Sequence, residues 1–413
     1  MSASLAQSRA TQRRWLGVVV LCFLAVFISY IDRTNISVAA LAMQAELGWD
    51  EATKGVVLSS FFVGYIVLQV ASGGLANRFG GRRLLGLAVI WWSLFTMLTP
   101  LAATLSLTAL IAARIALGLG EAAVFPASIN MVGRWVPAEH RSRAVAAFSS
   151  GISMGTVFAL PVTGWLVRDY GWPVPFYAFG LVGFVWAAWW FARVPEGRGT
   201  PEEGAPGDAR AIPWGRLLRT PAVWAIIVAH FANNWSLYVL LAWMPSYLKS
   251  TFAVSVADAG VLSALPPLTA FFVANTAGAV ADRMMRRGRS ATFTRKLMQA
   301  TGLFGAASFL LLVPFAPTLP VAVALMCGVS GLLACTLAGF APNGFDIAPR
   351  YADVIWGMSN TAATIPGIVG VAITGWLVQQ TGGYTAPFVL TAGVAMVGGI
   401  TYQLIGSGER LID

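Results

Sequence analysis

The chain is 413 residues long, and 57% of its residues are hydrophobic while only 11% are charged. A soluble domain has roughly 25% charged residues, so this composition indicates a polytopic membrane protein and excludes the ordinary soluble classes. The formal net charge of +10 fits basic loops on one side of a membrane better than nucleic-acid binding.

Twelve long apolar stretches predict an all-α polytopic protein, because about 20 apolar residues cross the hydrocarbon core of a bilayer. Residues 1–14 precede them as a polar and basic tail, and the run that follows is too long for a cleaved signal peptide. The predicted spans are, in chain order, 15–43, 54–76, 84–103, 106–133, 142–167, 174–192, 220–247, 257–281, 294–315, 319–345, 354–379 and 385–406.

A segment rich in Gly, Pro and acidic residues divides the spans into two sets of six. Residues 193–219 contain this segment, which cannot bury an apolar core, so we expect a cytoplasmic linker there. It joins an N-terminal six-helix bundle over 15–192 to a C-terminal six-helix bundle over 220–406. Residues 407–413 are expected to form a cytoplasmic tail.

The loop charges predict the orientation. Most of the 27 Lys and Arg residues lie in the N-terminal tail or in loops on the same side as this tail. The opposite side has only Lys54, Arg168 and Lys249, and only Arg33 and Arg114 lie well inside predicted spans rather than at their ends. Basic loops stay in the cytoplasm, so both termini are expected to be cytoplasmic.

The two sets of helices repeat each other in sequence. Gly73-Gly-Leu-Ala-Asn77-Arg78 matches Gly278-Ala-Val-Ala-Asp282-Arg283, and Thr163-Gly-Trp-Leu-Val167 matches Thr374-Gly-Trp-Leu-Val378 at nearly the same spacing. Repeats with an even number of helices have the same orientation in the membrane, which predicts two pseudo-symmetric bundles. The alternative is convergent packing of small residues between membrane helices.

Four charged residues lie clearly inside the predicted spans: Asp32, Arg33, Arg114 and Glu121. A charge inside hydrocarbon is costly, so each is a functional candidate. Arg114 and Glu121 lie on one face of a helix, about 10 Å apart along its axis. Asp32 and Arg33 are about 100° apart around their helix, so they cannot point the same way.

These directions predict a proton-coupled anion site. We expect Arg33 to face a central cavity with Tyr30 and Ser37, while Asp32 turns towards Arg114. A proton on Asp32 or Glu121 leaves the cluster positive, and a substrate anion then compensates that charge, so the two ligands favour each other. Burial disfavours a charged carboxyl group and a nearby arginine favours it, and this balance makes Glu121 the better proton site.

The alternative is that the four charged residues only hold the first and fourth helices together, although a buried ion pair is weak evidence for stability. Polar residues of the other helices are candidates for recognising the substrate. They are His230, Asn234 and Tyr238 at four-residue spacing, the i, i+4 pair Tyr65 and Gln69, and Asn275, Asn343, Asn360 and Thr364. For any single residue of this set, hydrogen bonding between helices is an equal explanation.

Several motifs carry a resemblance to a known family. The loop motif Gly73-x-Leu-Ala-Asn77-Arg78-x-Gly80-Gly81-Arg82-Arg83 is similar to that of the major facilitator superfamily, which the chain resembles over essentially its full length. More narrowly it resembles the anion:cation symporters, which include bacterial sugar-acid/proton symporters and animal sialic acid and vesicular glutamate transporters. This second resemblance rests on Tyr30-Ile-Asp32-Arg33, Arg114-x6-Glu121-x4-Pro126, Asn234-Trp235-x2-Tyr238, Pro245-x-Tyr247-Leu248 and Ile347-Ala-Pro349-Arg350.

The resemblance implies the twelve-helix major facilitator fold and makes Tyr65 a cavity residue. It also implies a cytoplasmic gate at Asn77 and Arg78 and at the matching residues Asp282 and Arg283. Asn77 departs from the Asp that is usual in the family, so the charged latch is expected only in the second copy.

The sequence therefore predicts a secondary active transporter in a cell inner (cytoplasmic) membrane, which takes up a small organic anion such as a sugar acid with protons by alternating access. Its partners are the anion, protons and the lipid bilayer, with no nucleic acid, and we expect a monomer without a cofactor.

A metal site is not expected, because the three cysteines have no metal-ligand spacing. An enzyme is not expected either, because His140 and His230 lack His-x3-His partners and no nucleophile elbow or Walker loop is present. The alternatives are a proton/drug antiporter, an exporter of aromatic carboxylates and a non-transporting nutrient sensor.

Overall fold

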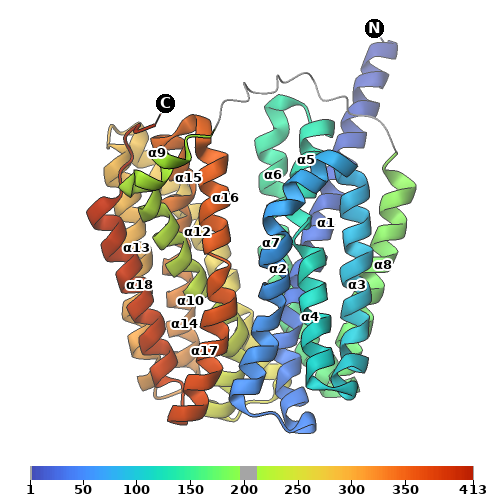
Figure 1. The fold of residues 1–413 in the computed structure, drawn as a ribbon, viewed down its shortest axis with the longest axis vertical. Helices are drawn as coiled ribbons and strands as arrows, with labels where there is room; N and C mark the ends of the chain where they lie inside the picture. The colour runs from blue at the N-terminus through green and yellow to red at the C-terminus, as the bar shows by residue number, and fades with distance from the viewer. Residues whose placement is uncertain (1, 196–211, 413) are drawn as a thin grey trace. The chain divides into compact units, whose positions relative to one another are not determined.

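The structure is a computed structural model that describes residues 2–195 and 212–412. Within these ranges the chain is helical and has no strand (Figure 1). The α-helices are α1 (Ser2–Leu47), α2 (Glu51–Phe79), α3 (Gly81–Leu105), α4 (Leu107–Glu121), α5 (Val124–Trp135), α6 (Arg141–Ser149), α7 (Gly151–Tyr170), α8 (Pro173–Arg193), α9 (Trp214–Arg219), α10 (Pro221–Phe252), α11 (Val256–Ser263), α12 (Leu265–Arg286), α13 (Ala291–Leu312), α14 (Leu319–Ala334), α15 (Phe340–Ile347), α16 (Ala352–Ala362), α17 (Ile365–Thr381) and α18 (Thr385–Ile405).

The described residues contain twelve helical segments that are long and apolar enough to cross a membrane. This number confirms the predicted twelve spans. The segments are Trp15–Leu47, Glu51–Gln69, Gly81–Leu105, Leu107–Trp135, Arg143–Tyr170, Pro173–Arg193, Pro221–Phe252, Val256–Arg286, Ala291–Phe315, Leu319–Ile347, Pro349–Thr381 and Thr385–Ile405. The middle of the predicted linker 193–219 lies outside the described residues.

Several spans consist of two consecutive helices, and proline explains two of these breaks. Pro126 has no N–H for the carbonyl group of Ala122, so α4 ends at Glu121. The Ser72 hydroxyl donates to that freed carbonyl oxygen at 3.1 Å. Pro366 similarly follows the break between α16 and α17. These breaks leave backbone carbonyl groups for side chains of other helices.

Close backbone packing fixes the helices that carry the buried charges. A Cβ atom at Gly64 of α2 would lie 1.9 Å from the carbonyl oxygen of Ile115 in α4, so only glycine fits there. A Cβ atom at Gly155 of α7 would lie 2.5 Å from the carbonyl oxygen of Phe27 in α1. Small residues of this kind allow membrane helices to approach closely and hold their polar faces in register.

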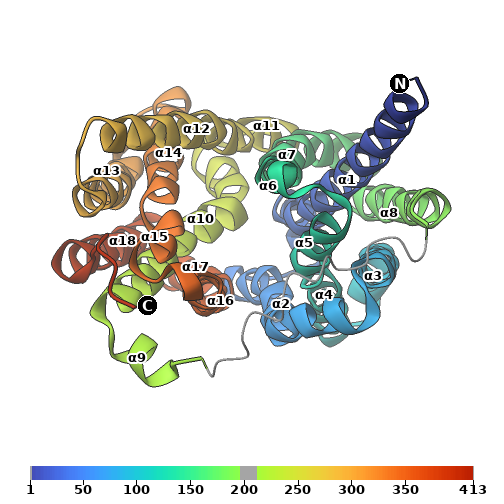
Figure 2. The ribbon, with the colours of Figure 1, turned by 90° about the horizontal axis from the view of Figure 1, so that it is seen from above.

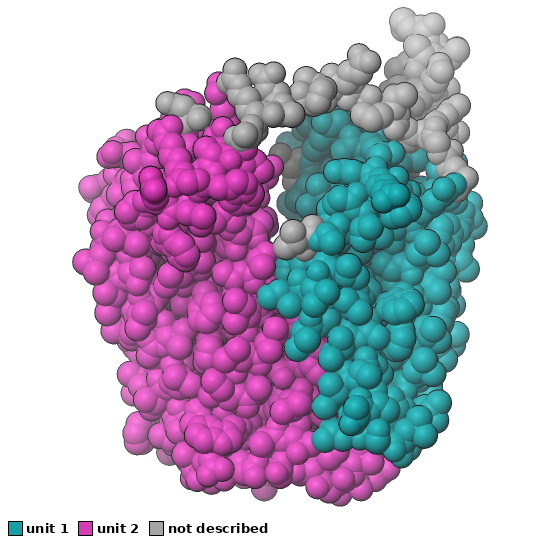
Figure 3. All heavy atoms as spheres, in the orientation of Figure 1, with its two compact units in different colours: residues 1–35, 63–159, 173–210 teal, residues 36–62, 160–172, 211–413 magenta. Residues whose placement is uncertain are grey.

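The chain divides into two compact units (Figure 3). Unit 1 comprises the described parts of Met1–Asn35, Val63–Ala159 and Pro173–Arg210, and unit 2 those of Ile36–Phe62, Leu160–Trp172 and Ala211–Asp413. In unit 1, α3 packs against α4 and α8, and in unit 2, α13 packs against α14 and α18 (Figure 2). The predicted bundle boundaries at residues 15–192 and 220–406 stay predictions.

Candidate functional site

Unit 1 contains a buried ion pair between α1 and α4. The Nη2 and Nε atoms of Arg33 donate to Oε2 of Glu121 at 3.1 Å and 3.3 Å. Arg33 is 6% exposed and Glu121 is fully buried. Both nitrogen atoms donate to the same carboxylate oxygen, so Glu121 binds two donors of the guanidinium group through only one of its two oxygen atoms.

A third donor completes the surroundings of Glu121. The Ser29 hydroxyl of α1 donates to the same Oε2 atom at 2.8 Å. The second oxygen, Oε1, is buried and accepts no hydrogen bond from a described residue. The two oxygen atoms of Glu121 are therefore chemically different: Oε2 is fixed by three donors, whereas Oε1 is available for a proton. Sequence reasoning missed Ser29, although it lies one helical turn before Arg33.

Two tyrosine rings contact the guanidinium group of Arg33. Its Cζ atom lies 4.6 Å from the ring centre of Tyr30 and 4.7 Å from that of Tyr65, within the range of cation–π attraction. The Nη1 atom also donates to the Tyr30 hydroxyl at 3.5 Å. The structure thus brings together Tyr30, Arg33, Tyr65 and Glu121, four of the residues that the sequence singled out. Gln69, one turn after Tyr65, is partly buried on α2.

The second acid and the second arginine lie close to this pair. Asp32 is fully buried and Arg114 is 1% exposed. Asp32 is within electrostatic range of both Arg114 and Glu121, and Thr96 and Trp92 of α3 lie beside its carboxyl group. Because the sequence prediction for Asp32 considered only Arg114 and the fourth span, it missed these contributions from α3. Asp32, Arg33, Arg114 and Glu121 thus form one cluster inside unit 1.

The predicted gate residues lie at the ends of α2 and α12. The Asn77 side chain accepts a hydrogen bond from Nδ2 of Asn130 at 3.1 Å, and Oδ1 of Asn130 accepts one from the amide of Gly81 at 3.0 Å. Arg78 lies over the ring of Phe79. Asp282 and Arg283 are exposed, and neither forms an ion pair with another described residue. Their role in gating stays a prediction.

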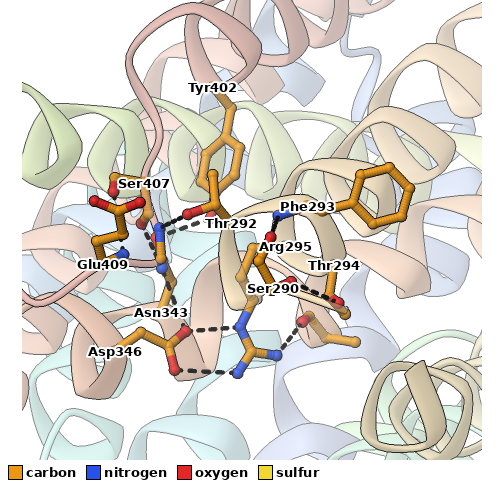
Figure 4. A network of polar contacts seen from close by, with 12 residues as sticks. Ser290, Thr292, Phe293, Thr294, Arg295, Asn343, Asp346, Tyr402, Ser407 and Glu409 are labelled. Atoms are coloured by element: carbon orange, nitrogen blue, oxygen red, sulfur yellow. Dashed lines mark hydrogen bonds and ion pairs between the residues drawn. The ribbon is translucent and has the colours of Figure 1, made fainter. Parts of the chain in front are cut away.

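Arg295, which is buried, forms an ion pair with the partly exposed Asp346 in unit 2 (Figure 4). Arg295 Nε donates to Asp346 Oδ2 at 2.8 Å, and its Nη1 atom donates to the carbonyl oxygen of Ala338 at 3.0 Å. Asn343 lies in the same network: its Oδ1 atom accepts from the Tyr402 hydroxyl at 2.8 Å. Arg295 stands at the start of the predicted span 294–315, where a charged residue normally faces water, yet it is only 6% exposed.

The polar stripe of α10 forms a separate network in unit 2. Asn234 Nδ2 donates to the carbonyl oxygen of Ala363 at 3.0 Å and to the Tyr238 hydroxyl at 3.4 Å. Asn234 Oδ1 accepts from Asn233, whose own Oδ1 atom accepts from the Thr336 hydroxyl at 2.8 Å. Asn234 therefore binds the carbonyl group at the break between α16 and α17. Sequence reasoning missed Asn233 and Thr336.

Two further predicted residues lie beside this network. His230 Nδ1 lies 3.2 Å from the Ser359 hydroxyl, and its ring stacks on Phe340 with the centroids 4.5 Å apart. Asn360 is partly buried on α16. The contacts of His230 are those of a packed helix residue, while substrate binding by Asn234, Tyr238 and Asn360 stays a prediction.

Twelve helical segments long enough to span a membrane, with a cluster of buried charges in unit 1, are the features of a multi-pass membrane transporter. The family model described as Major Facilitator Superfamily matches residues 22–370. The chain therefore belongs to the Major Facilitator Superfamily, and its predicted family is confirmed.

Curated relatives cover nearly the whole chain. Sodium-dependent phosphate transport protein 1, chloroplastic, of Arabidopsis thaliana is 39% identical over 97% of this chain and 80% of its own length. The chloroplastic ascorbate transporter of the same plant is 38% identical over 97% of this chain and 76% of its own length. Sialin of Ovis aries is 34% identical over 87% of this chain and 77% of its own length. The first two are named as transport proteins, which confirms a transporter rather than an enzyme.

Solved structures confirm the fold. A bacterial homolog of the human lysosomal transporter Spinster superposes with a TM-score of 0.82 at 18% identity, over 95% of this chain and 97% of the other. A D-xylose-proton symporter gives a TM-score of 0.76 at 15% identity, over 96% of this chain and 100% of the symporter chain. The twelve helices thus have the major facilitator fold that was predicted.

Proposed function

We propose that this transporter takes up a small organic anion, with a sugar acid as the first candidate, together with protons by alternating access. The observation that carries the proposal is the double contact of Arg33 with one oxygen of Glu121. A guanidinium group held in this way has its best anion-binding edge occupied by the protein's own carboxylate.

A substrate carboxylate competes with Glu121 for that edge. Charge-assisted pairs between arginine and carboxylate are strong and often use two parallel hydrogen bonds. A proton on Oε1 of Glu121 removes the negative charge that holds Arg33, and the guanidinium group can then bind the substrate anion. Proton and anion therefore bind cooperatively, and the coupling must be reciprocal.

Asp32 and Arg114 set the charge balance around this exchange. With both acids ionised the four groups sum to zero, so each proton that binds leaves one positive charge for an anion. Because Asp32 and Glu121 interact, they titrate as a pair and the apparent proton site belongs to the cluster. We propose Asp32 and Glu121 for proton coupling and Arg33, Arg114, Tyr30, Tyr65 and Gln69 for the anion side.

The choice of anion rests on chemistry and on relatives. Relatives at 38% and 39% identity are named for ascorbate and for phosphate, and both ligands are anions with several oxygen atoms. The hydroxyl and amide groups of Asn234, Tyr238 and Asn360 suit the hydroxyl groups of a sugar acid. Sodium-dependent phosphate transport is a second candidate, which the name of the 39% identical relative favours.

Uptake by purified protein in proteoliposomes tests the proposal. An inward proton gradient should drive accumulation of labelled gluconate or ascorbate in sodium-free buffer. Accumulation of phosphate that requires a sodium gradient would instead support the second candidate. Binding of an anion without flux under any gradient would contradict transport and favour a nutrient sensor.

We place the protein in a cytoplasmic membrane with both termini in the cytoplasm, on the strength of its basic loops. Two of the relatives are named chloroplastic, so the membrane itself must be determined by fractionation. Tags at either end that are protected from external protease in intact cells would support this orientation. Cleavage of both tags would contradict it.

A further inference from the structure

A lysine that was counted from the sequence among the basic residues of the side opposite the termini is buried in unit 2. Lys54 of α2 is 1% exposed, although lysine is almost never fully buried without partners. Its Nζ atom lies 2.7 Å from Oε2 of Glu51 and donates to Oε1 of Gln44 at 2.8 Å. Gln44 Nε2 donates in turn to Oε1 of Glu51 at 2.9 Å. The three side chains close a polar triangle at the end of α1 and the start of α2.

The face of an aromatic ring covers this triangle. Lys54 Nζ lies 4.9 Å from the ring centre of Trp243 in α10, and the Trp243 side chain is 1% exposed. The indole N–H of Trp243 donates to the carbonyl oxygen of Val371 in α17 at 3.0 Å. The lysine charge thus connects the ends of α1 and α2 to two helices from the second half of the sequence.

Backbone contacts continue the connection along α2. A Cβ atom at Gly375 of α17 would lie 2.4 Å from the carbonyl oxygen of Glu51 and 3.0 Å from Gly55 Cα. One turn beyond Gly55 lies Ser59, which is 5% exposed, and then Phe62, which packs against Gly367. The face of α2 from Gly55 to Phe62 is therefore buried against α17.

A second polar contact joins the start of α2 to α17. Gln379 of α17 accepts a hydrogen bond from the Ala52 amide at 3.0 Å and donates to Oδ2 of Asp50 at 3.1 Å. Hydrogen bonds from the side chain and amide of Thr53 keep the pKa of Asp50 below its usual value, so Asp50 stays an acceptor near neutral pH.

We propose that Gln44, Glu51, Lys54 and Trp243 form a conformational lock, the Lys54 lock, which holds the side of the transporter opposite the termini closed. The lock rests on the alternating-access part of the proposed function and not on the coupling ion or the substrate. Residues 36–62 belong to the first half of the sequence yet pack with helices of the second half. Opening that side requires α2 to leave α10 and α17, which breaks the contacts of Lys54.

Charge makes this lock reversible. Well-packed apolar residues would hold the helices together equally well, so an ion pair with a buried lysine is better explained by a switch than by stability alone. In the closed state the pair is satisfied by Gln44 and the Trp243 ring. In the open state water hydrates both ions, so the helices separate without leaving a charge unpaired in an apolar environment.

A thiol-labelling experiment tests the lock. Ser59→Cys places a probe on the buried face of α2, in a background in which the three native cysteines Cys22, Cys327 and Cys335 are replaced by serine. The protein is reconstituted in lipid nanodiscs and reacted with a water-soluble maleimide. Lys54→Met should raise the labelling rate about tenfold, which corresponds to about 1.4 kcal/mol in favour of the open state. Glu51→Gln should raise the rate in the same direction.

Two controls make the result decisive. Arg168→Gln removes an exposed ion pair with Asp169 and should leave the rate unchanged. Ser128→Cys, a fully buried probe in unit 1, should stay unreactive in Lys54→Met and so exclude general unfolding. If Lys54→Met does not fold, the labelling rate of the Glu51→Gln variant tests the lock instead, because the Glu51 side chain is partly exposed. Rates equal to those of Arg168→Gln would overturn the lock and leave the proton-coupling proposal untouched.

Discussion

Ser29→Ala is the most informative small perturbation of the candidate site, because it removes one donor from Glu121 and leaves Arg33 in place. The Ser29 hydroxyl donates to Oε2 at 2.8 Å inside a fully buried environment. A hydrogen bond to a charged group contributes about 1.5–3 kcal/mol. This donor stabilises the carboxylate more than the protonated acid, so its removal favours proton binding. At 1.36 kcal/mol per unit, the pH of half-maximal uptake should rise by about one to two units.

The assay is initial uptake in proteoliposomes between pH 4 and pH 9, with equal pH on both sides and a saturating concentration of the anion. Ser60→Ala is the matched control, because the Ser60 hydroxyl is also buried but donates to the Val57 carbonyl of its own helix at 2.7 Å. Its profile should match that of the wild type. An unchanged or lowered midpoint in Ser29→Ala, or an equal rise in Ser60→Ala, would refute the role given to Oε2.

Two other predictions concern binding and stability. Tyr65→Phe keeps the ring over Arg33 and should leave the KM for the anion within about twofold, whereas Tyr65→Ala should raise it by about 2- to 30-fold, in line with roughly 0.5–2 kcal/mol for a cation–π contact. Equal KM values for the two variants would contradict the role of the ring. Asp346→Asn leaves Arg295 buried without its counter-charge and should lower the free energy of unfolding by about 3 kcal/mol. Thermal unfolding in detergent measures this effect, and Asp169→Asn, at an exposed pair, should cost less than about 1 kcal/mol; similar losses would contradict the prediction.

The spans could be predicted from the sequence because hydrophobic length is a local property of the chain. The helix face on which a residue lies could also be predicted, because helical periodicity fixes the directions of residues that share a helix. The rotation of one helix against another is not local, and for this reason the sequence related Glu121 only to Arg114 of its own helix and turned Arg33 towards a cavity. The structure shows the contact with Arg33, together with Ser29, whose hydroxyl has no distinguishing pattern in the sequence.

Burial of charge was the feature that sequence reasoning misjudged most. Lys54 and Arg295 stand near the ends of apolar runs, where a charged residue normally faces water. Trp243, whose ring covers Lys54, and Asp346, which pairs with Arg295, are distant in sequence, so neither charge motif nor hydropathy could identify these two contacts. In contrast, Pro366 predicts a free carbonyl group nearby, although the sequence does not reveal that Asn234 is the donor that binds at this break.

Glu121→Gln tests proton coupling most directly, because it keeps the size of the side chain and removes its charge. The variant permanently resembles the protonated transporter, so Arg33 stays available to the anion. We predict that exchange of labelled for unlabelled anion across the membrane is retained, while accumulation against a gradient driven by protons is lost. Proton-driven accumulation at the wild-type level would contradict the central claim that Glu121 couples the proton to the anion.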